Sequence, residues 1–451
     1  MLAISAALGG LLFGYDWVVI GGARQFYEVY FHLQSATQVG WANSCALLGC
    51  LLGSMAAGNL AERSGRRPVL LLSALLFAVS SALTGWAFSF TSFIVWRIAG
   101  GVAIGLASNV SPLYIAEISP ATLRGRLVSL NQFAIVVGIL LAQVVNWILA
   151  RPVSPGLSSV ALLQSWNVQY GWRWMFTAVV FPAFCFAIAS FLLPESPRWL
   201  LNHGRYSDAG SILRRIGGEQ YAAAELIQIQ NSLGAHTKSS SWKELFQPGI
   251  RRVVFVAIGL AVLQQWTGIN ILFNYAAEIY RSAGYASNDI FLDIVITGSI
   301  NLIFTVIAMF LVDSLGRRKL MLSGCIGIAV CHLLCALAYT RGYLGTPVLI
   351  LTLAAIGCYA LTLAPVTWVL ISEIFPNPVR SRGIAVAVSS LWIASFLLTY
   401  TFPFMNNYFG TGGAFVSYGV ICLAGAVLVF IEVPETRGYT LEQIEAVSRK
   451  S

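Results

Sequence analysis

The sequence predicts an all-α membrane protein with twelve spanning helices arranged in two six-helix bundles. Three observations predict this class: an apolar composition, apolar runs long enough to cross a bilayer, and a set of motifs that occurs twice in the same order. Hydrophobic residues make up 57% of the 451 residues and charged residues only 10%, a balance outside the range of soluble globular domains. Composition alone therefore indicates a membrane protein, and the runs and motifs give the number of spans and the two bundles.

The first half of the chain contains six apolar runs separated by short polar turns. A spanning helix needs about 20 apolar residues. We place these runs at about 2–20, 41–60, 68–88, 93–115, 130–149 and 175–193. No basic region or small-residue cleavage site accompanies the first run, so we interpret it as a membrane span and not as a signal peptide.

The composition changes after the sixth run, and the second half repeats the pattern. Residues 194–249 are polar and basic, which predicts a linker with short amphipathic helices on the membrane surface; a regulatory site is the alternative. Six further runs follow at about 253–279, 290–311, 320–339, 347–371, 384–404 and a last one ending near 433. The expected domains are therefore 1–193, 194–249, 250–433 and a tail of 434–451.

Three short motifs occur once in each half. Glu117-Ile-x-Pro-x-x-x-Arg124-x-Arg126 recurs 256 residues later as Glu373-Ile-x-Pro-x-x-x-Arg380-x-Arg382. The Gly-Arg-Arg turn at 65–67 recurs at 316–318, and the Pro-Glu pair at 194–195 recurs at 434–435. This order indicates a duplicated six-span unit. Because an even number of spans separates the copies, the basic clusters share one side, which the positive-inside rule makes the cytoplasm. The net charge of +9 therefore reflects membrane topology and indicates no nucleic-acid partner.

The run at 253–279 carries more polar side chains than a spanning helix tolerates without a purpose. Gln264 and Tyr275 are eleven residues apart, which returns to almost the same helix face at about 100° per residue. Asn270 and Asn274 form an i, i+4 pair, and Gly268 allows a local break. Neutral groups that both donate and accept hydrogen bonds suit a polyhydroxyl ligand. Gln265 is the fifth such group on this span. Interhelical bonding is the alternative, but five such groups on one span favour a binding site.

Two opposite charges lie well inside the spans of the first half. A carboxylate at the centre of a span costs about 2.5–3.5 kcal/mol even on the insertion scale, so Asp16 needs a partner or a proton. Arg97 lies in the fourth run and is the candidate partner; the alternative is that it extends to the membrane interface.

Other functional classes lack the residues they need. The eight Cys lie within apolar runs without a CxxC pair, so we interpret them as packing residues, and the four His do not cluster. No metal-ligand cluster, phosphate loop or nucleophile triad can be assembled. We therefore expect no enzyme activity, no metal, no cofactor and no obligate protein partner.

Taken together, the motifs resemble those of the sugar porter family of the major facilitator superfamily, over nearly the whole chain. The family features are the Gly-Arg-Arg turns, the E-x6-R-x-R pair, PESPRWL at 194–200, QQ-x-x-GIN at 264–270 and PETRG at 434–438. The resemblance implies two bundles that rock about a central sugar site. In proton-coupled bacterial members, a pair matching Asp16 and Arg97 is the proton switch, whereas passive members usually have Asn at the Asp position.

The resemblance also implies roles for individual residues. Those expected to contact the sugar are Gln132, Gln264, Gln265, Asn270, Asn301 and Trp368, with Phe13, Tyr275 and Trp392 lining the cavity. Those expected to form a cytoplasmic gate, which locks the bundles when the outside is open, are Glu62, Arg66, Arg67, Glu117, Arg124, Arg126, Arg317, Glu373, Arg380 and Arg382.

Several positions depart from the family pattern and bear on the choice of sugar. Ala364 stands where the closest symporters have Gly, Leu391 replaces an amide, Ile139 replaces a Gln of xylose carriers, and Asn274 replaces a frequent Tyr. These four differences weaken a specific expectation of xylose. Trp17, next to Asp16, is larger than the usual residue, and the sequence assigns no effect to it.

We therefore expect a proton-coupled monosaccharide symporter, for a hexose or a pentose, that works by alternating access. Its partners are the sugar, protons and the lipid bilayer. It is expected in a cell membrane, the inner membrane if the source is bacterial, with both termini in the cytoplasm. A facilitative sugar uniporter is the first alternative, and Asp16 argues against it. A transport-inactive sugar receptor is the second; such receptors tend to have long cytoplasmic tails, and this tail is short.

Overall fold

The computed structural model describes residues 2–120, 123–152, 159–235, 242–285, 287–376, 379–433 and Glu435. Within these ranges, eleven helical segments are long and apolar enough to cross a membrane, judged by length and composition. The last of them, at 382–432, covers 51 residues and contains a non-helical glycine, Gly410, at φ 67°. This segment therefore accounts for two spans, and the predicted twelve spans are confirmed.

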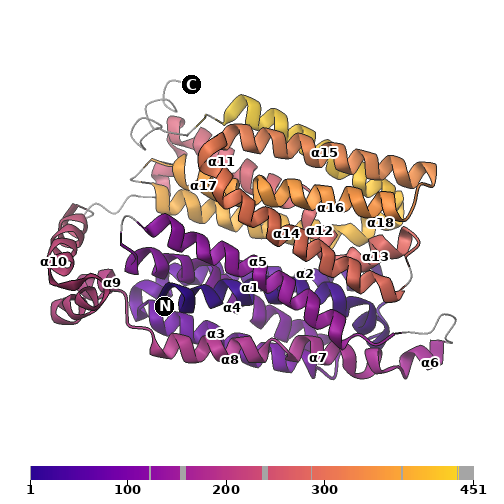
Figure 1. Ribbon diagram of the computed structural model, residues 1–451, viewed down its shortest axis with the longest axis horizontal. Helices are drawn as coiled ribbons and strands as arrows, with labels where there is room; N and C mark the ends of the chain where they lie inside the picture. Colours follow the sequence, from indigo (N-terminus) through magenta and orange to yellow (C-terminus); the bar gives the residue numbers. More distant parts are fainter. Residues whose placement is uncertain are drawn as a thin grey trace.

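The N-terminal bundle is formed by the first six spans. Its helices are α1 (Leu2–Tyr30), α2 (Ala36–Ser64), α3 (Arg66–Gly85), α4 (Phe90–Ile118), α5 (Arg124–Leu149), and a sixth span made of the π-helix η1 (Asn167–Gly171), α7 (Trp172–Thr177) and α8 (Val180–Leu192), with the short α6 (Ser159–Leu163) before it. Figure 1 shows these helices side by side in the lower half of the view.

The C-terminal bundle repeats this arrangement. Its helices are α11 (Pro248–Trp266), α12 (Ile269–Asn274), α13 (Ala276–Ser282), α14 (Ser287–Leu315), α15 (Arg317–Arg341), α16 (Thr346–Leu361), α17 (Leu363–Glu373) and α18 (Arg380–Glu432). The linker contributes α9 (Pro197–Asn202), α10 (Tyr206–Ala235) and the 3-10 helix η2 (Trp242–Phe246).

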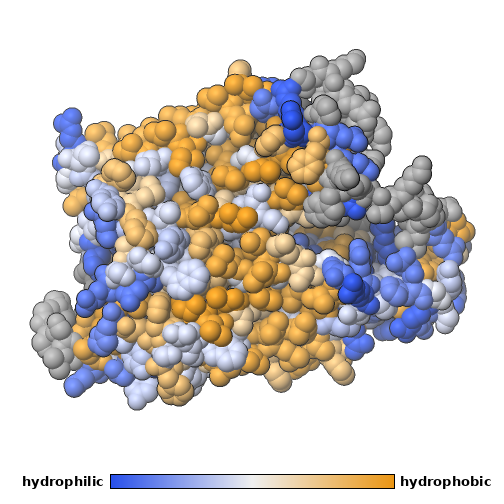
Figure 2. Space-filling model, turned by 180° about the vertical axis from the view of Figure 1, so that it is seen from behind, coloured by the Kyte–Doolittle hydropathy of each residue, from blue (hydrophilic) through white to orange (hydrophobic). Residues whose placement is uncertain are grey.

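The two ends of the molecule are distinguished by the helices that begin and finish there. We name the end at which α3 and α15 begin, next to α9 and α10, the motif end; the end at which α1 finishes and which carries α13 is the opposite end (Figure 1). Figure 2 shows apolar side chains over the middle of the molecule and hydrophilic ones gathered at the two ends. This distribution is that of a multi-pass membrane protein.

Glycines bring neighbouring helices of a bundle into backbone contact. A Cβ on Gly101 of α4 would lie 1.9 Å from the carbonyl oxygen of Ala46 on α2, and one on Gly105 would lie 2.3 Å from that of Cys50. Small residues drive helix association in membranes because lipid supplies no hydrophobic force between helices. The backbones of α4 and α2 therefore touch at these glycines.

The predicted end of the first span was wrong, for a local reason. The polar residues Arg24 and Glu28 were expected in a loop after residue 20, but α1 continues to Tyr30. The glycines at 21–22 do not end the helix because they pack against the backbone of Phe273 and the side chain of Asn146. The short helices predicted for the linker are present: α9 is one, and α10 is divided into two at Gly218, where φ is 85°.

Candidate functional site

The seventh span is broken at the point where its polar residues gather. α11 ends at Trp266, Gly268 adopts a left-handed φ of 82°, and α12 begins at Ile269. A side chain at Gly268 would be strained by this φ, and its Cβ would lie 2.7 Å from the Tyr418 ring. The buried His332 donates from Nε2 to the Thr267 carbonyl oxygen at 2.7 Å. The predicted local break is therefore present, and the neighbouring helix α15 satisfies a carbonyl that the break exposes.

A connected chain of carboxamides crosses this break. Gln264 donates to the Ala364 carbonyl oxygen on α17 at 3.4 Å, and Gln265 donates to the Gln264 side-chain oxygen at 3.2 Å. Asn270 in turn donates to the Gln265 oxygen. All three side chains are buried. Each of these bonds uses one of the two N–H groups of a carboxamide, so donor capacity is left for a ligand.

Three further predicted sugar residues lie on other helices. Asn301 is buried on α14 in the same bundle, and Gln132 is half-buried on α5 of the other bundle. Trp368 lies on α17, the helix that accepts the hydrogen bond from Gln264, and is 39% exposed.

Aromatic rings join the two bundles across the interface. The ring centroids of Phe13 and Trp17 on α1 lie 5.9 and 6.0 Å from that of Trp392 on α18, and 5.2 Å from each other. Trp392 is buried, and within the described residues its indole N–H has no hydrogen-bond partner. Sequence reasoning assigned no effect to Trp17, because only the fold shows which rings it contacts.

Tyr275 lies beyond the carboxamide chain, toward the opposite end. Its hydroxyl donates to the Thr399 carbonyl oxygen at 2.8 Å, and the Arg24 guanidinium lies 4.2 Å from its ring centroid. The argument that Gln264 and Tyr275 share a face assumed an unbroken helix. Because the helix breaks at Gly268, that spacing argument does not apply, and Tyr275 already uses its donor within the protein.

Asp16 and Arg97 form a buried ion pair between α1 and α4. Arg97 Nη1 donates to both carboxylate oxygens, at 3.0 and 2.9 Å, and neither side chain is more than 4% exposed. The Arg97 guanidinium also lies 5.3 Å from the Phe176 ring centroid. The alternative in which Arg97 extends to the interface is therefore wrong in this conformation. Removing one partner of a buried pair typically costs about 3–5 kcal/mol.

The repeated motifs at the motif end build the same contacts twice. Arg66 forms a two-pronged ion pair with Glu117, at 2.9 and 2.7 Å. In the second half, Arg317 pairs with Glu373 at 3.5 Å. The first pair joins α3 to α4 in the N-terminal bundle, and the second joins α15 to α17 in the C-terminal bundle. In this conformation each pair therefore connects helices of its own half, whereas the predicted gate joins the two halves.

The remaining predicted gate residues contact carbonyl groups, lie near the surface or are only partly described. Arg67 donates to the Phe191 carbonyl oxygen at 2.6 Å, and Arg380 to that of Phe375 at 3.1 Å. Glu62 and Arg126 are exposed and Arg382 is half-buried. The side chain of Arg124 lies outside the described residues.

Two glutamates that sequence reasoning gave no role cap the helices of the Gly-Arg-Arg turns. Glu195 accepts hydrogen bonds from the backbone N–H groups of Arg66 and Arg67, at 2.9 and 3.1 Å. Glu435 accepts one from Arg317 at 2.9 Å. A carboxylate is favourable at a helix N-terminus because the first N–H groups there lack partners. The recurrence of Pro-Glu in both halves was the signal that could have identified these caps.

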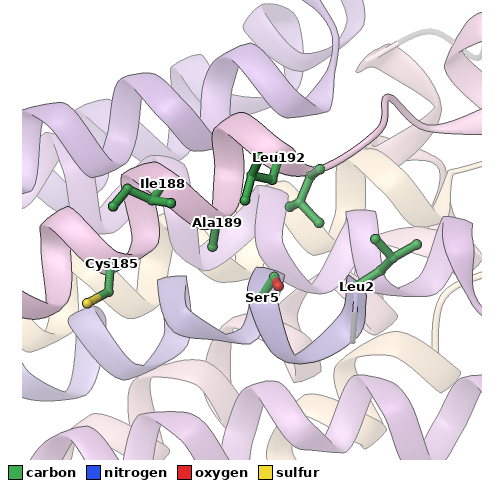
Figure 3. A pocket seen from close by; sticks show the side chains of 7 residues that line it. Leu2, Ser5, Cys185, Ile188, Ala189 and Leu192 are labelled. Atoms are coloured by element: carbon green, nitrogen blue, oxygen red, sulfur yellow. The ribbon is translucent and has the colours of Figure 1, made fainter.

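An apolar pocket near the motif end has a different character. It encloses about 390 Å³ between the start of α1 and α8 (Figure 3). Its lining residues are Leu2, Ser5, Cys185, Ile188, Ala189, Leu192 and Leu193. Only the Ser5 hydroxyl among these side chains bonds well to a polyhydroxyl compound. This pocket is therefore distinct from the candidate site at the carboxamides.

Residues 2–447 match the sequence model of the family described as "Sugar (and other) transporter". The chain belongs to this family. It is 36% identical over 477 residues to the D-xylose-proton symporter of Escherichia coli K12, covering 99% of this chain and 95% of that protein. It is 37% identical to the glucose transport protein of Synechocystis (97% and 95% covered) and 35% identical to the arabinose-proton symporter of Bacillus subtilis (99% and 94%).

Solved structures of the E. coli xylose transporter XylE are similar over the same length. The inward open conformation gives a TM-score of 0.86 at 35% identity, covering 99% of this chain and 98% of that one. The form bound to 6-bromo-6-deoxy-D-glucose gives a TM-score of 0.82 at 35% identity, with the same coverage. The two-bundle fold of the sugar porters is therefore the fold of this chain.

Proposed function

We propose that the protein is a proton-coupled monosaccharide symporter that works by alternating access. The observation that carries this proposal is the buried ion pair of Asp16 with Arg97. Asp16 lies on α1, the helix that also supplies Phe13 and Trp17 to the bundle interface. A titratable group on this helix can link protonation to the relative position of the bundles. The names of the E. coli and B. subtilis relatives, both proton symporters for pentoses, support this choice.

The sugar site is proposed between the bundles, around the chain from Gln264 to Asn270. The carboxamides offer donors and acceptors to hydroxyl groups, Trp392 offers an indole N–H, and Phe13 offers an apolar ring face. Gln132 and Asn301 extend this set from α5 and α14. A polyhydroxyl ring with one apolar face matches these groups.

We propose that the motif end faces the cytoplasm, so that both termini lie there, and that this conformation is inward-facing. Within the described residues, the side-chain contacts that support a closed opposite end are the ion pair of Arg24 with Glu278 and the hydrogen bonds of Gln25 with Arg281 and of Gln143 with Thr297. All three join the bundles through the halves of the helices nearer the opposite end. The domain division at residues 193, 249 and 433 belongs to the same proposal.

Protonation would act through Arg97. While Asp16 is ionised, it holds Arg97 on α4; once Asp16 is protonated, this attraction is lost and α1 can move relative to α4. Sugar bound to the carboxamides favours closure of the bundles around it. Once the site opens to the cytoplasm, the sugar and the proton are both released there, and Asp16 is ionised again. The proton gradient then supplies the free energy for sugar accumulation.

Purified protein in liposomes with an entrapped pH indicator tests this function. Addition of D-xylose, L-arabinose or D-glucose outside is expected to acidify the interior, and an imposed inward proton gradient is expected to drive accumulation of at least one of them. Sugar entry without acidification would favour the uniporter alternative. Sugar binding without entry would favour the receptor alternative.

A further inference from the structure

Arg24 lies between two carboxylates that belong to different bundles. Its Nε bonds Glu28, one turn further along α1, at 2.5 Å. Its Nη1 bonds Glu278 on α13 of the other bundle at 2.6 Å. The guanidinium also lies over the Tyr275 ring. A planar fork with a fixed geometry is suited to hold two carboxylates at once.

Glu278 is anchored from its own side as well. Its second oxygen accepts a hydrogen bond from Asn406 of α18 at 2.5 Å, and Asn406 in turn accepts one from Thr411 at 2.9 Å. Glu278 therefore transmits a pull on α13 to α18. A second contact across the interface lies next to it, since Arg281 donates to Gln25 at 2.5 Å.

The Arg24–Glu278 ion pair is sufficiently shielded from water to contribute to the equilibrium between the inward-facing and outward-facing states. The side chains of Arg24 and Glu278 are 12% and 31% exposed, between a surface pair and a buried one. Attraction between charges rises as water is excluded, and screening by salt falls. Separation of the bundles at this end must break the Arg24–Glu278 contact, whereas the Arg24–Glu28 contact stays within α1 and can persist.

The contact also lies close to the candidate sugar site. Tyr275, under Arg24, is the residue at which α12 gives way to α13, and α12 begins with Ile269 and Asn270. Asn270 and α13 are connected through α12, which has only six residues, so a displacement of α13 also displaces Asn270. Sugar contact and closure of the opposite end are thus mechanically linked.

We propose that Arg24 is a positioning residue for transport: it latches α13 of the second bundle to α1 of the first and thereby holds the extracellular side closed. This inference rests on the proposed alternating-access function and names the contact that sets its inward–outward balance. Loss of the latch raises the outward-facing fraction. Only the outward-facing state binds external sugar, and apparent affinity scales with the fraction of protein in that state. Loss of the latch therefore lowers the KM for external sugar.

The chain offers a matched pair of variants. Glu278→Gln and Glu28→Gln each remove one carboxylate charge from the same guanidinium, but only the first replaces the ion pair between the bundles with a weaker neutral hydrogen bond. Hydrogen exchange measured by mass spectrometry in lipid nanodiscs reports both ends without sugar or a proton gradient. Glu278→Gln is expected to raise exchange at least threefold in peptides from the end of α1 and from α13, and to slow it at the motif end. Glu28→Gln is expected to stay within about 1.5-fold of the parent.

The charge exchange Arg24→Glu with Glu278→Arg provides the second test. It restores an ion pair across the interface and is expected to return the exchange pattern and the external KM toward the parent, while Arg24→Glu alone behaves like Glu278→Gln. Equal effects of Glu28→Gln and Glu278→Gln, or a double variant no closer to the parent than either single one, would overturn the latch. Because this readout needs no transport, such a result leaves symport standing, whereas absence of any sugar uptake by the parent protein overturns symport and not the contact.

Discussion

At the scale of single residues, Gln265 is the centre of the candidate site. It donates to Gln264 and accepts from Asn270, so its side chain connects α11 to α12 across the break. Removing it leaves two buried carboxamides with fewer partners, in addition to any bond to the sugar. Unsatisfied buried polar groups cost about 1–3 kcal/mol each, and about 1.4 kcal/mol is tenfold in affinity.

Gln265→Ala is therefore expected to weaken sugar binding tenfold or more. Isothermal titration with a panel of hexoses and pentoses measures this. Asn109→Ala is the matched control, because Asn109 also bonds another helix through its carboxamide, to Ser54 at 3.0 Å, but lies within the N-terminal bundle. Parent-like binding by Gln265→Ala, with Asn109→Ala unchanged, would show that the sugar binds elsewhere.

Some residue contacts could be predicted from the sequence and others could not, for physical reasons. The pairing of Asp16 with Arg97 could be predicted because a charge inside a span is unfavourable in free energy unless an opposite charge lies next to it, and few candidates exist. The surroundings of Tyr275 did not follow, since they depend on where the helix breaks. The contact of Trp17 with Trp392 needs the packing of two segments far apart in the chain.

At the scale of helices, the break at Gly268 sets the direction in which the second part of the seventh span continues. A left-handed φ of 82° costs a residue with a Cβ about 1–2 kcal/mol, and here the Cβ would also collide with the Tyr418 ring. Gly268→Ala must therefore shift α12 or Tyr418. Either change moves Asn270 relative to Gln265.

Gly268→Ala is expected to lower the melting temperature and to reduce sugar binding severalfold. Gly249→Ala is the control, because Gly249 lies in the first turn of α11 and a methyl group added there would have no other atom within 4 Å. Alanine is favoured over glycine in a helix by about 1 kcal/mol, so this control is expected to be neutral or stabilising. Equal melting temperatures and binding for the two variants would contradict a structural need for the break.

The helices themselves were largely predictable, because an apolar run of about 20 residues has one stable form in a bilayer. Their ends were harder. Hydropathy ended the first span where polar residues begin, yet α1 continues through Arg24 and Glu28 because both find partners in the folded protein. Polarity marks the edge of the membrane and does not mark the end of a helix.

At the scale of the whole molecule, transport depends on the competition between contacts at the two ends. The duplication in the sequence predicted two equivalent bundles. The pair Arg66–Glu117 in the first bundle and the pair Arg317–Glu373 in the second are equivalent contacts of this kind. Sequence could not indicate which end is closed, because that depends on contacts such as Arg24–Glu278 between segments more than 250 residues apart in the chain. The proton must act on this balance through a group inside the membrane.

Asp16 is that group in the proposed mechanism, and Asp16→Asn tests it. The substitution keeps the shape of the side chain and removes its titration. One proton moving across 100 mV supplies about 2.3 kcal/mol, and one pH unit adds about 1.4 kcal/mol. Together these correspond to a sugar accumulation of the order of a few hundredfold. Asp16→Asn is expected to abolish uphill uptake while sugar binding and equilibrative exchange persist.

The competing explanation is that Asp16 serves only to neutralise Arg97. In that case the counter-charge is needed at every stage, whereas the proposed mechanism passes through a neutral Asp16. Loss of the counter-charge then costs the full amount of about 3–5 kcal/mol that is typical of a broken buried pair, and the Asp16→Asn protein should unfold or stop binding sugar. The double variant Asp16→Asn with Arg97→Gln separates the two explanations, because it removes the stranded charge as well as the titratable group. A neutral pair that still accumulates sugar, with uptake that a protonophore collapses, would show that the proton is carried elsewhere. If the double variant folds and binds but only equilibrates sugar across the membrane, the coupling proton is the one that Asp16 holds.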